Sequence, residues 1–374
     1  MSLSISRIEA FVYRAPIETP VQTSFGIMRD RPAVFVRVTD ADGTAGWGEI
    51  WCNFPTVGAE HRARLVNAVF APLLQGQTFE SPENVFRALT VRTAVLAIQA
   101  AEPGPIAQCI AGIDIAVWDL HAKRLRQPLW RLLGGNASTI PVYASGLNPT
   151  APEQLAAQRY AEGYRAFKLK VGFGVTRDLA NLQALRGALG DCELMVDANQ
   201  GWDLATAHDM AAAFAPFHLR WLEEPLRADR PWHEWRQLAR RSAMPLAAGE
   251  NLAGYDAFDA ALGSRALGVV QPDIAKWGGF TGGLVVARKI LASGRRYCPH
   301  YLGAGIGLLA SAHLLAAVGG DGKLEVDANP NPLRTLTCGP LLNVTGGTAM
   351  LGDSPGLGVS PDLVALGEFA VAHA

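Results

Sequence analysis

Hydrophobic residues beyond residue 135 form short runs rich in β-branched residues, and most of these runs are separated by stretches with a helical period. The stretches at 152–162, 175–189 and 307–318 are rich in Ala and Leu. Alternating strands and helices predict a parallel sheet, and eight units of nearly constant length favour a closed α/β barrel over an open, doubly wound sheet. The runs expected to be strands are 140–145, 166–172, 193–199, 220–225, 245–250, 268–273, 296–300 and 323–327.

The first 135 residues show the pattern of a small α+β unit. The expected elements are strands at 5–13, 33–38 and 44–50, with a turn at Asp42-Gly43, and helices at 59–70 and 106–124. A glycine turn at 132–136 follows the second helix and marks a boundary. We therefore predict a first domain of residues 1–135 and a barrel of residues 136–335. The Gly/Pro-rich residues 336–374 are expected to pack back on the first domain.

Composition and charge narrow the class of protein. Of the 374 residues, 49% are hydrophobic and 18% are charged, and the formal net charge is −1. This balance does not favour nucleic acid or an anionic membrane as a partner. Neither a signal-peptide pattern nor an apolar run long enough to span a bilayer is present, so we expect a cytoplasmic protein. The dispersed cysteines predict reduced thiols, and they are Cys52, Cys109, Cys192, Cys298 and Cys338.

Polar and ionisable residues gather where the predicted barrel strands end. In a barrel of this kind, those positions face the active site. Charges on seven consecutive strand ends would repel one another strongly unless a cation lay among them. The residues at these ends are Lys168, Lys170, Asp197, Asn199, Glu223, Glu224, Glu250, Asn251, Asp273, His300 and Glu325.

Three of these carboxylates predict a metal site. Asp197, Glu223 and Glu250 lie on three adjacent predicted strands at intervals of 26 and 27 residues, so they are expected to project side by side. Hard oxygen donors without nearby Cys or His suit Mg²⁺, with Mn²⁺ as a substitute, in octahedral geometry. The alternative is that the three carboxylates are paired with lysines and arginines.

Lys168 and Lys170 are expected on one face of a strand, because side chains alternate with a period of two. Their mutual repulsion would lower the pKa of one or both, as a general base near neutral pH requires. A Lys-x-Lys pair by itself is more typical of a solvated strand face. The carboxylates on the next strands make the lysines candidate bases.

Asp273 and His300 lie on neighbouring predicted strand ends, where the carboxylate would fix the imidazole tautomer and raise its basicity. Unpaired, His300 would more commonly be a satisfied core residue. Glu325, on the last strand, would donate a hydrogen bond to an enolate oxygen if it were protonated. Its alternative is an ion pair with Arg334.

A glycine-rich segment at 303–307 follows a predicted strand and opens a helix. Its glycine spacing is one residue short of a dinucleotide-binding loop, and no acidic residue follows at the required distance. We expect its backbone N–H groups to face a substrate anion at the helix N-terminus.

Taken together, these motifs resemble those of the enolase superfamily, and within it the mandelate racemase subgroup, over nearly the whole chain. The resemblance implies an α/β fold, a modified TIM barrel (β/α)7β with an α+β N-terminal capping domain, and Mg²⁺. It also implies removal of the proton α to a carboxylate through an enediolate. The matching motifs are Lys168-x-Lys170, Asp197-x-Asn199, Glu223-Glu224-Pro225, Gly249-Glu250-Asn251, Gln271-Pro272-Asp273, His300 and Glu325.

The resemblance also implies a role for each matching residue. Asp197, Glu223 and Glu250 would be the metal ligands. Lys170 would be the base on one face of the substrate, with Lys168 tuning it or contacting the substrate carboxylate. Asp273 and His300 would serve the other face, and Glu325 would hydrogen-bond the enediolate. The muconate-lactonizing subgroup that this chain also resembles has a lysine at the place of Asp273, so the aspartate favours the racemase-like subgroup. Lys276 lies three residues further along, and its side chain is expected to leave the barrel mouth.

Dehydration of a sugar acid to a 2-keto-3-deoxy acid is the leading expectation for the reaction, because enzymes with this full set of residues are often such dehydratases. Racemisation or epimerisation of a 2-hydroxy acid is the alternative, and a non-catalytic scaffold barrel is the alternative of another class. The resemblance also suggests a homo-oligomer that acts on a small carboxylate.

Specificity is expected from segments 20–31 and 51–60, which mix aromatic residues with arginines. The aromatics suit an apolar substrate and the arginines an anionic polyol, so the sequence leaves this choice open. The specificity residues considered are Phe25, Arg29, Arg31, Trp51, Asn53 and Phe54, and those expected to contact the substrate are Asn199, Lys168, Arg29, Trp51 and Asn53.

Overall fold

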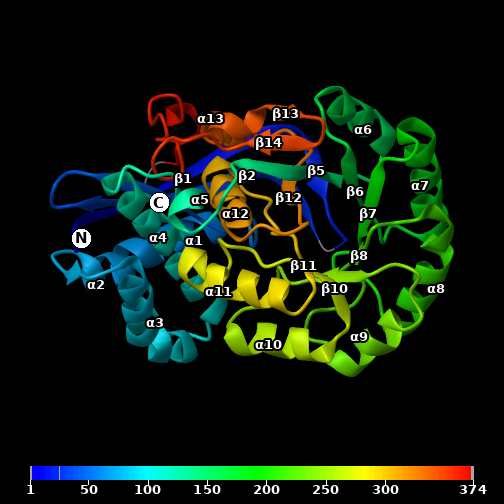
Figure 1. Ribbon diagram of the computed structural model, residues 1–374, viewed down its shortest axis with the longest axis horizontal. Coiled ribbons are helices and arrows are strands. Elements are labelled where there is room, and N and C mark those ends of the chain that lie inside the picture. The colour runs from blue at the N-terminus through cyan, green and yellow to red at the C-terminus, as the bar shows by residue number, and fades with distance from the viewer. Residues whose placement is uncertain (1, 25, 372–374) are drawn as a thin grey trace.

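The computed structural model describes residues 2–24 and 26–371 (Figure 1). The N-terminal part is an antiparallel sheet in the order β3-β2-β1-β4, packed against helices. Its elements are β1 (Leu3–Gln22), β2 (Ile27–Asp40), β3 (Ala45–Ile50), α1 (Gly58–Leu65), α2 (Ala71–Leu74), β4 (Thr78–Phe79), α3 (Pro82–Gln99), α4 (Pro103–Arg124) and α5 (Leu129–Leu132). A π-helical turn, Val66–Phe70, joins α1 to α2.

Two features of this capping domain differ from the sequence pattern. β1 and β2 extend beyond the expected strands as a two-stranded ribbon, in which Gln22 pairs with Ile27. Helix α3 is not predicted at all, because its exposed apolar residues Val91, Val95 and Ile98 obscure the helical alternation. The strands and helices that the sequence does predict in this domain are confirmed, with shifted ends.

The barrel confirms the predicted alternation, since each of the eight expected runs contains a strand. All neighbouring pairs are parallel; the order is β11-β10-β9-β8-β7-β6-β5, and β12 pairs with β5. The strands are β5 (Thr139–Leu147), β6 (Ala166–Lys170), β7 (Glu193–Asp197), β8 (Leu222–Glu223), β9 (Leu246–Ala248), β10 (Leu267–Val270), β11 (Arg296–Tyr297) and β12 (Leu324–Asp327).

The barrel helices form an arc around the strands from α6 to α10, whereas α11 and α12 face the capping domain (Figure 1). Helix α12 is apolar on all sides and almost fully buried, as a helix enclosed between two domains requires. The helices are α6 (Pro152–Ala161), α7 (Val175–Leu189), α8 (Leu204–Phe214), α9 (Trp232–Ala239), α10 (Tyr255–Ser264), α11 (Gly279–Ala292), α12 (Gly305–Val318) and α13 (Pro332–Thr337).

The C-terminal segment touches both parts of the chain. The hairpin β13 (Val344–Thr345) and β14 (Thr348–Met350) pairs antiparallel with β5, and Ala370 bridges to Tyr13 of β1. In Figure 1 this orange-to-red segment runs along the top of the molecule from the barrel to the capping domain.

An apolar layer inside the barrel supports the polar layer above it. Side chains along a strand alternate between its two faces, so the residue two positions after each member of the apolar layer also points into the barrel. Ala166 is thus followed by Lys168, and Trp221 by Glu223. The apolar layer consists of Tyr143, Ala166, Met195, Trp221, Ala247, Val269 and Cys298.

Candidate active site

Lys168 is the centre of the polar layer. Its Nζ lies 2.6 Å from Oε1 of Glu223 and 2.6 Å from Oε1 of Glu325, and the side chain is fully buried. Burial by itself would lower the pKa of this ammonium, but the two carboxylates together outweigh burial and hold the pKa well above its usual range. Lys168 is therefore a permanent cation that joins β6 to β8 and β12.

Lys170 points to the barrel mouth from the end of β6. The strand register places Asp197 of β7 directly beside it, and Lys170 Nζ lies 2.5 Å from Asp197 Oδ2. Burial would lower the pKa of Lys170, yet the Asp197 carboxylate raises it further than Lys168 lowers it. Repulsion from Lys168 does lower the pKa of Lys170, as predicted, but the expected net lowering is wrong for both lysines, because each ammonium contacts a carboxylate.

The three predicted metal ligands lie at adjacent strand ends, where Asp197 and Glu223 are buried and Glu250 is partly exposed. Asp197 and Glu223 are direct partners in the β7–β8 register. Glu223 also accepts hydrogen bonds from Gln271 Nε2 at 2.6 Å and Trp221 Nε1 at 3.1 Å. Glu250 contacts His300 Nε2, and its Oε1 lies 3.7 Å from Lys276 Nζ. Burial raises the pKa of Glu223 to about 7, while the basic neighbours of Glu250 outweigh burial and hold its pKa well below the usual value.

These pairings mean that the alternative foreseen from sequence, carboxylates bonded to basic side chains, describes the geometry. Within residues 2–24 and 26–371, no group of three or more His, Cys, Asp or Glu side chains is arranged so that it could hold a metal ion. Asp197, Glu223 and Glu250 as ligands therefore stay a prediction.

The chemistry of the donor set nevertheless fits a divalent cation. Glu224 Oε2 and Asn199 Oδ1 are buried acceptor atoms without a hydrogen-bond donor. Burial, followed by the charges of Glu250 and Asp197, raises the pKa of Glu224 well above its usual value. Mg²⁺ prefers oxygen ligands, and these two unpaired acceptor oxygens lie beside three further carboxylates.

Asp273 and His300 form the expected pair. His300 Nδ1 lies 2.7 Å from Asp273 Oδ2, and Oδ1 of Asp273 accepts the backbone N–H groups of Ala275 and Lys276 at 2.8 and 3.1 Å. Burial would lower the pKa of His300, but Glu250, Glu325 and Asp273 together raise it well above its usual value. The imidazole is thus oriented and basic, as the sequence predicts.

Glu325 is neither the protonated hydrogen-bond donor nor the ion-pair partner of Arg334 that the sequence suggested. It is bonded to Lys168 and Ser145, and its Oε2 accepts the N–H of Tyr301 at 3.1 Å. Burial would raise its pKa, but Lys168 and His300 lower it below the usual value, so the carboxyl is ionised rather than protonated. The expected partner Arg334 instead donates to the carbonyl oxygen of Asp327 at 2.8 Å, so the predicted ion pair is wrong.

A cavity of about 240 Å³ lies above these groups, between the strand ends and the capping domain. Lys170 and His300 both line it, as do the predicted specificity residues Trp51 and Asn53. The full lining is Thr23, Met28, Trp51, Asn53, Phe54, Lys170, Asn199, Gln200, Glu250, Asn251, Lys276, His300 and Leu302.

Two residues are placed differently from the sequence prediction. Arg29 is exposed and absent from the cavity, because the β2 alternation turns Met28 inward instead. Lys276, expected to leave the mouth, lines the cavity, and its Nζ lies 3.2 Å from Asn251 Oδ1. Arg31 is buried in an ion pair with Asp327, and Phe25 lies outside the described residues.

The glycine-rich segment binds an anion from the protein itself. The N–H groups of Ala304 and Gly307 donate to Glu49 at 2.6 and 2.9 Å. The expectation that they face a substrate anion is therefore wrong. The signal for Glu49 was available in the sequence, since Glu49, Trp51 and Asn53 are spaced by two and share one face of an extended segment.

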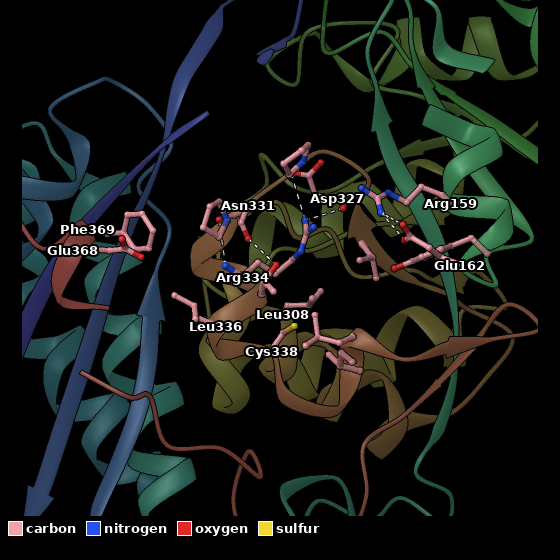
Figure 2. A pocket seen from close by; sticks show the side chains of 17 residues that line it. Arg159, Glu162, Leu308, Asp327, Asn331, Arg334, Leu336, Cys338, Glu368 and Phe369 are labelled. Carbon is pink, nitrogen blue, oxygen red and sulfur yellow. Dashed lines mark hydrogen bonds and ion pairs between the residues drawn. The ribbon is translucent and has the colours of Figure 1, made fainter. Parts of the chain in front are cut away.

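A larger cavity, of about 530 Å³, is lined by residues of α6, α12 and α13 and by Val326 and Asp327 at the end of β12 (Figure 2). Its guanidinium groups are already bonded: Arg334 to the carbonyl oxygens of Asp327 and Asn329, and Arg159 to the carbonyl oxygen of Ala328 and to Glu162. It holds no acid–base pair that resembles Lys170 and His300. The smaller cavity is therefore the candidate active site. No helix in the described part of the chain has the length and apolarity to cross a membrane.

Two family profiles match the chain. The profile of the mandelate racemase/muconate lactonizing enzyme N-terminal domain matches residues 7–134, and the enolase C-terminal domain-like profile matches residues 152–365. Together they cover most of the chain and both of its structural parts.

Relatives of known activity match over the full length. A 3,6-anhydro-alpha-L-galactonate cycloisomerase from Streptomyces coelicolor is 34% identical over 98% of this chain and 99% of its own length. A D-galactarolactone cycloisomerase from Agrobacterium fabrum is 30% identical with the same coverage. Matches that cover less of the chain include an L-talarate/galactarate dehydratase and an N-succinyl-L-Arg/Lys racemase.

Solved structures agree with this grouping. A mandelate racemase/muconate lactonizing enzyme from Bordetella bronchiseptica is 58% identical with a TM-score of 0.93, covering 98% of this chain and 99% of that one. A racemase from Streptomyces coelicolor with bound magnesium is 32% identical with a TM-score of 0.89, covering 98% and 100%. These relatives are lyases and isomerases, and this excludes the non-catalytic scaffold. The chain is an enzyme of the mandelate racemase/muconate lactonizing enzyme family, within the enolase superfamily.

Proposed function

We propose that this enzyme removes the α-proton of a sugar-derived carboxylic acid and then expels the oxygen substituent on the β-carbon. The observation that supports the proposal is that Lys170 and His300 both line one small cavity and come from strands that are not neighbours. Their strands β6 and β11 are separated by β7 to β10 on one side and by β5 and β12 on the other. A substrate between them presents one face to an amine and the other to an imidazole.

Mg²⁺ held by Asp197, Glu223 and Glu250 would supply a Lewis acid that stabilises negative charge developing on the substrate carboxylate. The three carboxylates would then share their charge with the cation rather than with the lysines. Lys170 would lose part of the interaction with Asp197 that now raises its pKa, while repulsion from Lys168 would remain. The weaker attraction to Asp197 and the remaining repulsion from Lys168 would both favour the neutral amine that a general base requires.

The proposed reaction balances without any further reactant. Lys170 or His300 takes the α-proton, and the electron pair of that C–H bond forms the double bond as the β C–O bond breaks. The imidazolium of His300 gives a proton to the departing oxygen. The resulting enol tautomerises to a 2-keto acid.

The leaving oxygen decides the outcome. Loss of a hydroxyl is dehydration, which remains the leading proposal for an acyclic acid. A ring oxygen stays attached after the same bond breaks, so the product is an isomer of the substrate. The two full-length cycloisomerase relatives favour this second outcome for an anhydro acid or a lactone. Return of the proton to the opposite face, which is racemisation, is the third outcome.

The lining of the cavity supports a small hydroxylated acid. Its volume of about 240 Å³ is slightly below the range of drug-sized ligand pockets, about 300–1,000 Å³. Asn53, Asn199 and Gln200 offer hydrogen-bonding groups to hydroxyls, and Lys276 offers a cation distinct from the proposed base. A homo-oligomeric state and a cytoplasmic location are further proposals, which sedimentation and cell fractionation would test.

The decisive experiment incubates the enzyme with Mg²⁺ in deuterated water and a panel of aldonates, aldarates, their lactones and anhydro acids. Proton NMR would report loss of the α-proton signal, and mass spectrometry would separate dehydration from cycloisomerisation by the loss or retention of one water. A Lys170→Ala variant is expected to lose the activity. Absence of both α-proton exchange and keto product across the whole panel would disprove the proposal.

A further inference from the structure

Glu49 lies near the end of β3, in the capping domain, and its carboxylate is buried against the barrel. One oxygen accepts the N–H of Ala304 at 2.6 Å and the other accepts the N–H of Gly307 at 2.9 Å. Burial raises the pKa of Glu49 to about 7, although the neighbouring Tyr301 hydroxyl and both amides lower it. The carboxylate thus caps the first turn of α12, where helix N–H groups otherwise lack acceptors.

The segment that Glu49 holds begins at His300. Every residue between His300 and α12 is bonded to a different part of the molecule. Tyr301 N–H donates to Glu325, the Leu302 carbonyl accepts Asn53 Nδ2, and the Gly303 carbonyl accepts Asn331 Nδ2. Ala304 is held by Glu49. Glu49 therefore fastens the end of a short loop that starts at the imidazole and includes Leu302, a wall of the cavity.

The glycines of this segment permit the close approach. A Cβ atom at Gly303 would lie 2.7 Å from Glu49 Oε1 and 2.3 Å from the Tyr301 hydroxyl. A Cβ atom at Gly307 would lie 2.2 Å from the same hydroxyl. The glycine spacing that superficially suggests a dinucleotide loop is thus explained by a carboxylate and a tyrosine packed against the backbone.

We infer that Glu49 is a positioning residue for His300, which ties the acid–base group on one side of the cavity to the docking of the capping domain. Glu49 acts through the loop 301–304 and does not touch the substrate. Lys170, on β6, is bonded to Asp197 and not to this loop, so we expect Glu49 to leave it unaffected. The inference rests on the proposed function where catalysis is concerned, but the anchoring of the loop is independent of it.

The test compares Glu49→Ala and Glu49→Gln with wild type. Alanine removes both oxygen acceptors. Glutamine keeps one of them and places its side-chain NH₂ group, a donor, against the other of the two backbone N–H groups, those of Ala304 and Gly307. The matched control is Asp114→Asn. Asp114 is another buried carboxylate of the capping domain; it accepts the Thr281 N–H at 2.9 Å in the first turn of α11 and does not contact loop 301–304.

The first readout is hydrogen–deuterium exchange of the amides of residues 301–307, which needs no substrate. Both Glu49 variants are expected to exchange faster there than wild type and the control. The second readout is α-proton exchange with the two α-epimers of an accepted acid. Exchange on the His300 face is expected to fall roughly 10- to 100-fold, as small displacements of a catalytic group do, while the Lys170 face changes at most about twofold.

Unchanged protection of 301–307 in Glu49→Gln, or equal losses on both faces, would overturn the inference. If Glu49→Ala does not fold, Glu49→Gln carries both readouts. A wild-type enzyme that exchanges no α-proton, with the loop still loosened in the variants, would reject the proposed function but keep the anchoring role of Glu49.

Discussion

Lys276 Nζ lies 4.7 Å from the centre of the Trp51 indole ring, so that a cation from a barrel loop and an aromatic ring from the capping domain meet at the cavity. Lys276 is also 3.7 Å from Oε1 of Glu250. The two domains therefore build the charged wall of the cavity jointly, and neither domain contains it alone.

Lys276→Met is expected to weaken substrate binding. It removes a cation that lines the cavity together with Lys170 and His300. Loss of one partly buried charge pairing with a substrate carboxylate should raise KM roughly 10- to 150-fold, corresponding to the strength of a hydrogen bond to a charged group, about 1.5–3 kcal/mol. Steady-state kinetics would measure KM and kcat separately. Lys276→Arg keeps the charge and the ring contact and serves as the control, and equal KM values for the two variants would contradict the role of charge.

Lys168→Met is expected to destabilise the fold by roughly 3–5 kcal/mol, because it leaves two buried carboxylates without their cation. Those carboxylates, Glu223 and Glu325, are each 2.6 Å from Lys168 Nζ. Urea unfolding in the presence of a chelator would measure the change in the free energy of unfolding. The double variant Lys168→Met/Glu325→Gln removes one of the unpaired charges and should recover part of the loss. No recovery would mean that the pair does not interact energetically.

Magnesium is expected to raise the melting temperature of the enzyme, since a ligand that binds only the folded state stabilises it by roughly 2.7 kcal/mol at 100 times its Kd. Asp197→Asn and Glu223→Gln should lose this shift. Glu224→Gln tests the neighbouring carboxylate, whose Oε2 is buried without a partner. If Glu224→Gln abolishes the shift and Glu223→Gln does not, the ligand is Glu224 and the assignment from sequence is wrong. Glu80→Gln, at an exposed position, controls for nonspecific effects.

Asp114→Asn is expected to gain stability relative to wild type as pH rises. Burial raises the pKa of Asp114 to about 7 from its ordinary value of 3.8. Between these values the folded chain keeps a proton that the unfolded chain has lost, so stability falls with rising pH in wild type. The asparagine does not titrate. The free energy of unfolding of the variant minus that of wild type should therefore increase by roughly 2–4 kcal/mol as the pH rises to about 7, and should then level off.

Urea unfolding at about pH 5 and about pH 8 would measure this difference, because groups that titrate alike in both proteins cancel. The Thr281 N–H can still donate to the side-chain oxygen of an asparagine at position 114, and the Thr281 hydroxyl oxygen can accept from its NH₂ group, so the contact with α11 is retained. A difference that stays constant between the two pH values would show that Asp114 is already ionised at the lower one.

The pattern of residues along the chain was sufficient to predict the barrel and the polar residues of its mouth. Alternation with a period of two, combined with parallel strands, forces Lys168, Asp197 and Glu223 to the same side as the apolar residues two positions earlier. Asp273 beside His300 follows from the same rule. These relationships are local in each strand, and the fold merely repeats them around the barrel.

Apart from the pair Asp273 and His300, the partners of the charged groups were decided only by the tertiary structure. The sequence cannot reveal that Lys168 bonds Glu325, or that Arg31 bonds Asp327, since these residues are brought together by the closing of the sheet and by the docking of the capping domain. That docking also placed Glu49 at α12. The electrostatic energy of a buried group depends on its nearest opposite charge, and contacts between residues far apart in the chain set that distance, such as the pair Arg31 and Asp327, which are 296 residues apart.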